Sequence, residues 1–152
     1  MSACKTIAVV VALVGTCLTG SLNAQGASLG ISVQGGLCTP DIWAIAPVGQ
    51  PLMLQIAQPP SGTAQGCKLV IVYSPVTVLG VLDPKNMGIW IEKNFQDCTD
   101  IAVKFTVPKL FDQTTWSVQA LVLREDGTML SSNVFTLILD TQMYQQQANP
   151  AP

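Results

Sequence analysis

The stretch that decides the fold is IAVKFTVPKLFDQTTWSVQALVLREDGTMLSSNVFTLILD, residues 101–140, which holds three runs of alternating apolar and polar residues. In the first run, residues 101–107, isoleucine, valine and phenylalanine alternate with alanine, lysine and threonine. A period of two is typical of a β-strand with one buried face and one face in water. Pro108 cannot donate a ladder hydrogen bond, so it should end this strand.

The remaining two runs predict a β-hairpin. Residues 116–123 and 133–139 are rich in the β-branched, aromatic and aliphatic residues that strands favour. Between them, residues 125–128 read Glu-Asp-Gly-Thr, and Asp-Gly readily adopts the positive φ angles of a tight turn. The stretch therefore contributes three strands, which we expect to form the centre of the fold.

Upstream of this stretch, short apolar runs alternate with turn-forming segments. The segment Asp83-Pro84-Lys85-Asn86 has the composition of a turn, so the runs on either side of it should pair as a hairpin. No window shows an apolar pattern of helical period longer than two turns. Further strands are predicted at residues 28–34, 41–46, 52–58, 68–74, 76–82 and 88–93.

Seven to nine short strands, spaced about ten residues apart, predict an all-β fold, and specifically an antiparallel immunoglobulin-like β-sandwich. A small β-barrel is the alternative fold. In either case the apolar residues of the alternating runs should fill the interior. The predicted core consists of Leu52, Leu54, Ile56, Leu69, Ile71, Tyr73, Val103, Phe105, Trp116, Val118, Ala120, Phe135 and Leu137.

The N-terminal residues have the organisation of a secretory signal peptide. Lys5 precedes an apolar segment, residues 7–18, and small and polar residues follow up to Ala24. A membrane anchor is the alternative, but about twelve apolar residues are fewer than the ~20 that span a bilayer. We expect a signal peptide at residues 1–24, a β-sandwich domain at residues 25–140 and a disordered Gln/Pro-rich tail at residues 141–152.

The composition argues against several partners. Lys and Arg number 7, Asp and Glu number 9, and charged residues make up only 11% of the chain. Because no Lys/Arg cluster is present, neither nucleic acid nor an anionic membrane surface is an expected partner. The chain has no histidine, the commonest general base and metal ligand. The tail also lacks the apolar end of a GPI signal. We expect a secreted, extracellular protein without metal or cofactor.

Three cysteines, Cys38, Cys67 and Cys98, follow the predicted cleavage site. In an oxidising compartment two of them should form a structural disulfide and leave one thiol over. If the strands form a simple meander, in which each strand reverses the direction of the one before, the strands at residues 41–46 and 68–74 begin at the same end of the sheet. Cys38 and Cys67 precede these two strands, so this arrangement favours a Cys38–Cys67 disulfide. Pairings that use Cys98 stay open. A metal site and a catalytic thiol are disfavoured because CxxC spacing and histidine are both missing.

The sequence contains no recognisable catalytic motif. There is no GxSxG segment and no histidine to activate a serine. Two of the nine carboxylates could act as a glycosidase pair, but nearly all of them fall in predicted turns, where Asp bonds the local backbone. Asp97 and Asp100 flank Cys98 without the ligand array of a calcium loop. We therefore predict that the protein is not an enzyme.

Tryptophans and a two-sided apolar pattern provide the candidate binding residues. Trp43 and Trp90 lie in predicted strands, where each could fill the core or stack on a sugar ring from the surface. Trp116 is expected in the core. Residues 68–74 and 116–123 are apolar on both faces. Part of the outer face should therefore either bind a partner or a second copy, or lie beneath a layer of loops.

From residue 47 onward, the order of these signals resembles a known family. The sequence PVGQPLMLQIAQPPSG is a turn that enters a strand and a Pro-Ser-Gly loop, KFTVP ends a strand in Val-Pro, and WSVQALVLREDGTMLSSNVFTLIL is a terminal hairpin. In these features, over roughly residues 47–139, the chain resembles the secreted immunoglobulin-like domain of fungal Knh-like and Ser-Thr-rich GPI-anchored cell-wall proteins. It departs from them because no Ser/Thr-rich stalk or GPI signal follows residue 139. The resemblance implies a noncatalytic role at or near the cell wall. It does not identify specific binding residues in this chain.

The sequence thus predicts a secreted, noncatalytic binding or structural module of the extracellular space or cell wall. Its expected partners are cell-wall polysaccharide or a surface protein, and self-association is a further expected property. One alternative is an effector-type protein that binds a host or wall component through an apolar face. Another is a glycan-active enzyme that uses two of the loop carboxylates.

Overall fold

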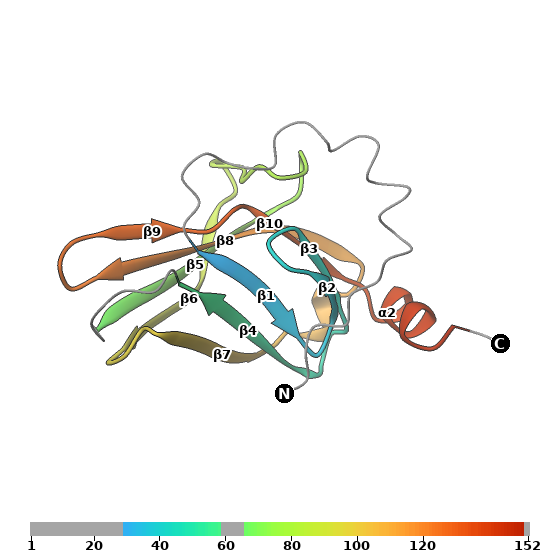
Figure 1. The fold of residues 1–152 in the computed structure, drawn as a ribbon. Coiled ribbons are helices and arrows are strands. Elements are labelled where there is room, and N and C mark those ends of the chain that lie inside the picture. The colour runs from blue at the N-terminus through green and yellow to red at the C-terminus, as the bar shows by residue number, and fades with distance from the viewer. Residues whose placement is uncertain (1–28, 59–65, 151–152) are drawn as a thin grey trace.

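Two β-sheets face each other in the computed structural model, which describes residues 29–58 and 66–150 (Figure 1). The chain is mostly β, as predicted. The predicted signal peptide lies outside the described residues. The smaller sheet has the order β1 (Gly30–Gln34), β4 (Pro51–Ala57), β7 (Asp100–Thr106). The larger has the order β2 (Leu37–Thr39), β3 (Trp43–Ala46), β10 (Phe135–Leu139), β8 (Thr114–Arg124), β5 (Cys67–Pro75), β6 (Gly88–Phe95), and β9 (Met129–Ser131) also pairs with β8.

Strand β7 follows the alternation that predicted it. Ile101 and Val103 are buried between the sheets, whereas Ala102 and Lys104 are exposed. Phe105, which lies on the inward side, is half-buried and packs against the core. The strand ends at Thr106, just before the Val-Pro pair, and a short 3-10 helix η1 (Lys109–Phe111) leads into β8. One buried face therefore fixes the register of this strand.

The predicted core is the observed core. Eleven of its thirteen residues are buried, and the other two, Tyr73 and Phe105, are half-buried and pack against them. Burying an aliphatic or aromatic side chain of this size contributes about 1.5–3 kcal/mol. The inward faces of the two sheets therefore supply the main stabilisation of the fold.

The prediction of antiparallel pairing throughout is wrong for the larger sheet. Strand β10 pairs with β3 in parallel, with Leu137 opposite Ala44, so this sheet is mixed. The reason is connectivity, because the chain leaves β3 for β4 in the other sheet and returns to the larger sheet only later. No hairpin joins β3 to β10, so no short turn imposes opposite directions on them.

Residues 76–82 form a loop rather than the predicted strand. Val81 donates its backbone N–H to the carbonyl of Val78 at 3.3 Å, and Gly80 has a φ of 74°, a combination that turns the chain. The predicted turn that begins at Asp83 is present, because Asn86 donates to the Asp83 carbonyl at 3.1 Å. Strand β6 therefore pairs with β5 instead of with residues 76–82.

The C-terminal tail is not disordered as predicted over its first eight residues, which form helix α2 (Thr141–Ala148). The Asp140 side chain caps this helix by accepting the backbone N–H of Met143 at 2.8 Å. Asp112 accepts the N–H of Thr141 at 3.0 Å and ties the helix to the loop before β8. No helix within the described residues is long and apolar enough to cross a membrane.

Two buried serines on the larger sheet differ in their hydrogen bonding. Between β9 and β10, the Ser132 hydroxyl accepts the backbone N–H of Ala120 at 2.9 Å and donates to the Asn133 carbonyl at 2.7 Å. The hydroxyl of Ser117 is equally buried and has no hydrogen-bond partner among the described residues. The Ser132 hydroxyl therefore supplies the acceptor for the backbone N–H of Ala120, whereas the Ser117 hydroxyl makes no hydrogen bond within the described residues.

We predict that Ser132→Ala lowers the free energy of unfolding by about 1–3 kcal/mol, because the buried N–H of Ala120 loses its acceptor. The matched change Ser117→Ala should leave stability unchanged or raise it slightly, because it removes a buried hydroxyl without a partner. Urea unfolding of both variants measures the difference. Equal effects of the two changes would contradict the hydrogen bonding described for Ser132.

Candidate interaction surface

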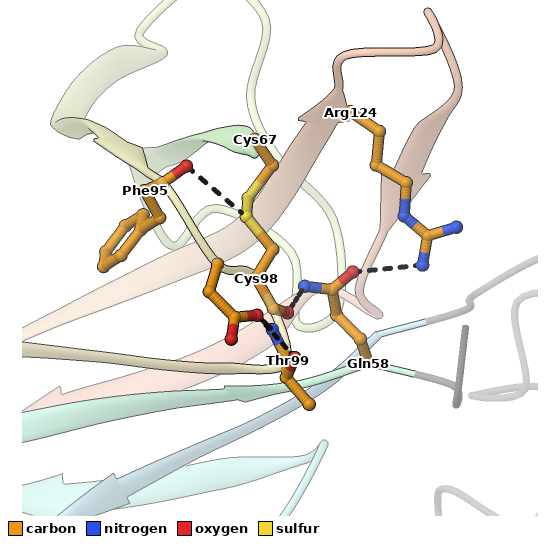
Figure 2. The surroundings of a disulfide bond; sticks show 7 residues. Gln58, Cys67, Phe95, Cys98, Thr99 and Arg124 are labelled. Atoms are coloured by element: carbon orange, nitrogen blue, oxygen red, sulfur yellow. Dashed lines mark hydrogen bonds between the residues drawn. A yellow bond between two sulfur atoms is a disulfide. The ribbon is translucent and has the colours of Figure 1, made fainter. Parts of the chain in front are cut away.

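A disulfide between Cys67 and Cys98 joins the two sheets (Figure 2). Cys67 begins β5 of the larger sheet, and Cys98 lies in the loop that leads into β7 of the smaller sheet. Both cysteines are 6% exposed, and their Cα atoms are 6.0 Å apart. The disulfide closes a segment that contains β5, β6 and the loop between them.

The favoured Cys38–Cys67 pairing is therefore wrong. Strands β3, β10 and β8 separate β2, which carries Cys38, from β5. At ~4.8 Å per strand this is a separation of about 19 Å, far beyond the ~7 Å limit for the two Cα atoms of a disulfide. The strands do not form the simple meander on which that prediction relied. Cys38 is completely buried in the core.

Gln58 connects the disulfide to the end of β8. Its side-chain amide donates to the carbonyl of Cys98, and its amide oxygen accepts a hydrogen bond from Arg124 at 3.1 Å (Figure 2). The Cys98 loop also has a local turn, in which Asp97 accepts the hydroxyl and the backbone N–H of Thr99. These two hydrogen bonds hold the pKa of the Asp97 carboxyl below its usual value, and the bond from the Thr99 hydroxyl has the larger effect.

Six of the seven aspartates in the described residues accept a backbone N–H through their side chains. Within residues 29–58 and 66–150, no group of three His, Cys, Asp or Glu side chains is placed to hold a metal ion. The carboxylates serve instead as local acceptors for N–H groups that would otherwise lack partners. The side chains of Asp41, Asp83, Asp97, Asp112, Asp126 and Asp140 each accept a backbone N–H.

The two candidate tryptophans lie on opposite faces of the larger sheet and do not form one site. Trp90 points inward, where its ring meets Phe105 at 4.8 Å and Trp116 at 5.6 Å between centroids. A register shift in the β5–β6 pairing at this point is typical of a bulge, which turns both Trp90 and Ile91 toward the core. Trp90 is therefore a core residue rather than a surface ligand.

Trp43 lies on the outer face. Its neighbours in β3, Ala44 and Ala46, belong to the core, so the alternation of the strand directs Trp43 away from it. The half-buried Trp43 lies opposite Thr39 of β2 and Thr136 of β10. Of the two candidates, only Trp43 is placed to contact a ligand.

The outer face of β6, β5, β8 and β9 carries a diagonal row of aliphatic residues, which we call the apolar stripe. It is continuous because each member lies either opposite the next on a neighbouring strand or two residues away on the same strand. Its ends are exposed, by 61% at Ile89 and by 66% at Met129, whereas Val72 is covered. The apolar stripe consists of Ile89, Val72, Val70, Leu121, Leu123 and Met129.

The loop of residues 76–87, the β5–β6 loop, lies beside the apolar stripe. The backbone N–H of Asp83 donates to the hydroxyl of Ser74 at 2.9 Å, which holds the loop over the outer face of β5. Ser74 is completely buried as a result. The loop itself is apolar and exposed, with exposed fractions of 50–60% at Val78, Leu79, Val81 and Met87. A loop thus covers one part of the outer face and leaves both ends of the stripe exposed.

Sequence reasoning found part of this surface. Val70, Val72, Leu121 and Leu123 were detectable because both faces of their strands are apolar. The β5–β6 loop was missed because its valines and leucines were assigned to a strand. The signal that could have revealed it is Gly80, which interrupts an apolar run at the position where a tight turn needs positive φ.

No family model matches this chain, and no curated protein matches it by sequence. The resemblance to fungal cell-wall domains therefore stays a prediction.

We predict that the double variant Cys67→Ala/Cys98→Ala loses about 3–4 kcal/mol of unfolding free energy, because a cross-link between residues 31 positions apart restricts the unfolded chain. Chemical unfolding of the variant and the natural chain measures this loss. Non-reducing peptide mapping should join the Cys67 peptide to the Cys98 peptide. A map that joins Cys67 to Cys38 would contradict the structure.

Proposed function

We propose that this protein is a secreted, noncatalytic module with an immunoglobulin-like β-sandwich, which binds other components of the extracellular space or cell wall. The order of its long strands supports this fold. In chain order these are β1, β4, β5, β6, β7, β8 and β10, and the first, second and fifth form one sheet while the others form the second. A constant-type immunoglobulin domain likewise keeps its first, second and fifth strands in one sheet and its third, sixth and seventh strands in the other. Its fourth strand joins the first of these sheets, whereas β6, the fourth strand here, pairs with β5 in the larger sheet.

Two further features differ from an antibody domain. The disulfide joins the third strand of this series to the approach of the fifth, whereas antibody domains join the second and sixth strands. The buried Trp116 lies on the sixth strand, β8, instead of on the third. The proposal therefore concerns the sandwich architecture and not membership of the antibody family.

The outer face of the larger sheet is the observation that carries the proposed binding role. A sheet face turned to water normally carries polar residues. Here Ile89, Leu123 and Met129 are 46–66% exposed, and the β5–β6 loop adds more exposed aliphatic residues. Such a surface is typical of an interaction site rather than of a solvated face.

Secretion is supported by the disulfide and by the N-terminal sequence. Disulfides persist in oxidising compartments such as the extracellular space. Residues 1–24 have the charged, apolar and small-residue order of a signal peptide. The resemblance to fungal cell-wall domains adds the wall as the proposed location, with polysaccharide or a surface protein as the partner.

The second candidate function is that of an effector-type protein, which binds a host or wall component through its apolar face. The observation that favours it is the β5–β6 loop, since Val78 and Leu79 are more than half exposed on a segment fixed to the sheet by Ser74. An ordered apolar loop loses little conformational entropy on binding.

We predict that the chain is retained on insoluble chitin or glucan and that Trp43→Ala weakens this retention roughly tenfold, because an indole ring supplies stacking area for a sugar. Sedimentation of the polysaccharide with bound protein measures retention. Leu110→Ala is the matched control, because Leu110 is 76% exposed on η1 and belongs to neither the stripe nor the loop.

Trp90→Ala is unsuitable for this test, because Trp90 packs on Phe105 and Trp116 and its removal would lower stability. Absence of retention on both polysaccharides would count against the wall as the site of binding. Release of soluble sugar from either one, abolished by a single carboxylate change, would contradict the noncatalytic proposal.

A further inference from the structure

The β5–β6 loop and the apolar stripe together give the outer face a raised part and a flatter part. Figure 1 shows the segment between β5 and β6 above the larger sheet, on the side away from β1, β4 and β7. The stripe crosses the neighbouring strands beside it. Both parts are aliphatic, so each matches the other in polarity.

The chemistry of this surface suits a protein rather than a sugar. The stripe and the exposed loop positions contain valine, leucine, isoleucine and methionine but no aromatic ring, whereas sugars are recognised by stacking on aromatic side chains. Together these residues expose on the order of 700 Å², close to the ~800 Å² that each partner contributes to a standard interface. The surface is therefore large enough for a specific protein contact.

Charge favours one protein partner in particular. Lys68 and Glu92 form an ion pair at the margin of the stripe, with Lys68 opposite Leu123 and Glu92 opposite Val70. The two side chains are 42% and 51% exposed. A surface that carries adjacent charges of opposite sign is complementary to itself under a two-fold rotation that exchanges them.

We propose that a second copy of this chain binds the outer face and forms a two-fold symmetric dimer. A two-fold axis through the ion pair places each Lys68 near the partner's Glu92. The same axis lays the β5–β6 loop of each copy over the end of the other stripe, at Leu123 and Met129. The contact is isologous and closes at two copies. This inference rests on the proposed role of the outer face as a binding surface, and it names the partner.

The first test is the mass of the chain, expressed from Met1 and purified, in sedimentation equilibrium over a range of concentrations. The natural chain should form dimers at micromolar concentrations. Leu79→Lys in the loop and Leu123→Lys in the stripe should each weaken dimerisation at least tenfold, since each places an unpaired charge in the contact. Leu110→Lys, at a more exposed leucine outside this face, should have no effect, and near-ultraviolet circular dichroism verifies that each variant is folded.

The second test uses the ion pair. Lys68→Glu and Glu92→Lys should each weaken self-association, because like charges then face each other across the two-fold axis. When the two variants are mixed, every such contact joins opposite charges, so heterodimers should form at least as tightly as the natural dimer. A structural defect in either variant would not be repaired by mixing.

A natural chain that stays monomeric up to roughly 1 mM would overturn the inference. A dimer that is insensitive to both Leu79→Lys and Leu123→Lys would overturn it as well. Polysaccharide retention is scored separately. A monomeric chain that is retained on chitin or glucan would contradict the proposed dimer but support the proposed function. A dimer that is not retained would support the proposed dimer and contradict binding to the cell wall.

Discussion

The packing of aromatic rings around Trp116 is the constraint that the two-sheet arrangement depends on. From β8, the Trp116 ring lies 4.8 Å from Tyr73 of β5, 5.6 Å from Trp90 of β6 and 5.0 Å from Phe111 of η1. Trp90 in turn meets Phe105 of β7 edge to face, which connects the larger sheet to the smaller one. Tilted and edge-to-face pairs of this kind contribute about 0.5–1.5 kcal/mol each beyond their buried area.

This cluster also decides what the outer face presents. Because the bulge turns both Trp90 and Ile91 inward, Ile89 and Glu92 on either side of them point outward. The cluster anchors β5 near Tyr73, and the disulfide anchors the other end of the same strand at Cys67. With β5 fixed at both ends, the β5–β6 loop can be exposed and apolar without loosening the sheet beneath it.

The sequence predicted features that depend on local pattern. The alternation at residues 101–107 is set by one buried face, and Asp126-Gly127 forms a turn in which Gly127 has a φ of 85°. Local pattern did not predict the parallel pairing of β3 with β10 or the Cys67–Cys98 pairing, because both join segments that are distant in the chain. Separating the outward Trp43 from the inward Trp90 needed the bulge in β6, which no local pattern reveals.

The outer face divides into two regions of different chemistry, and this division bears on what the protein binds. At one end the half-buried Trp43 lies opposite Thr39 and Thr136, and its indole ring offers an aromatic surface for stacking. At the other end the stripe and the loop are aliphatic, with one ion pair at their margin. A contact between copies through the aliphatic region would leave the two Trp43 rings free to bind a repeating polymer. Two weak sites linked in this way gain affinity through effective concentration, so self-association and wall binding would reinforce each other.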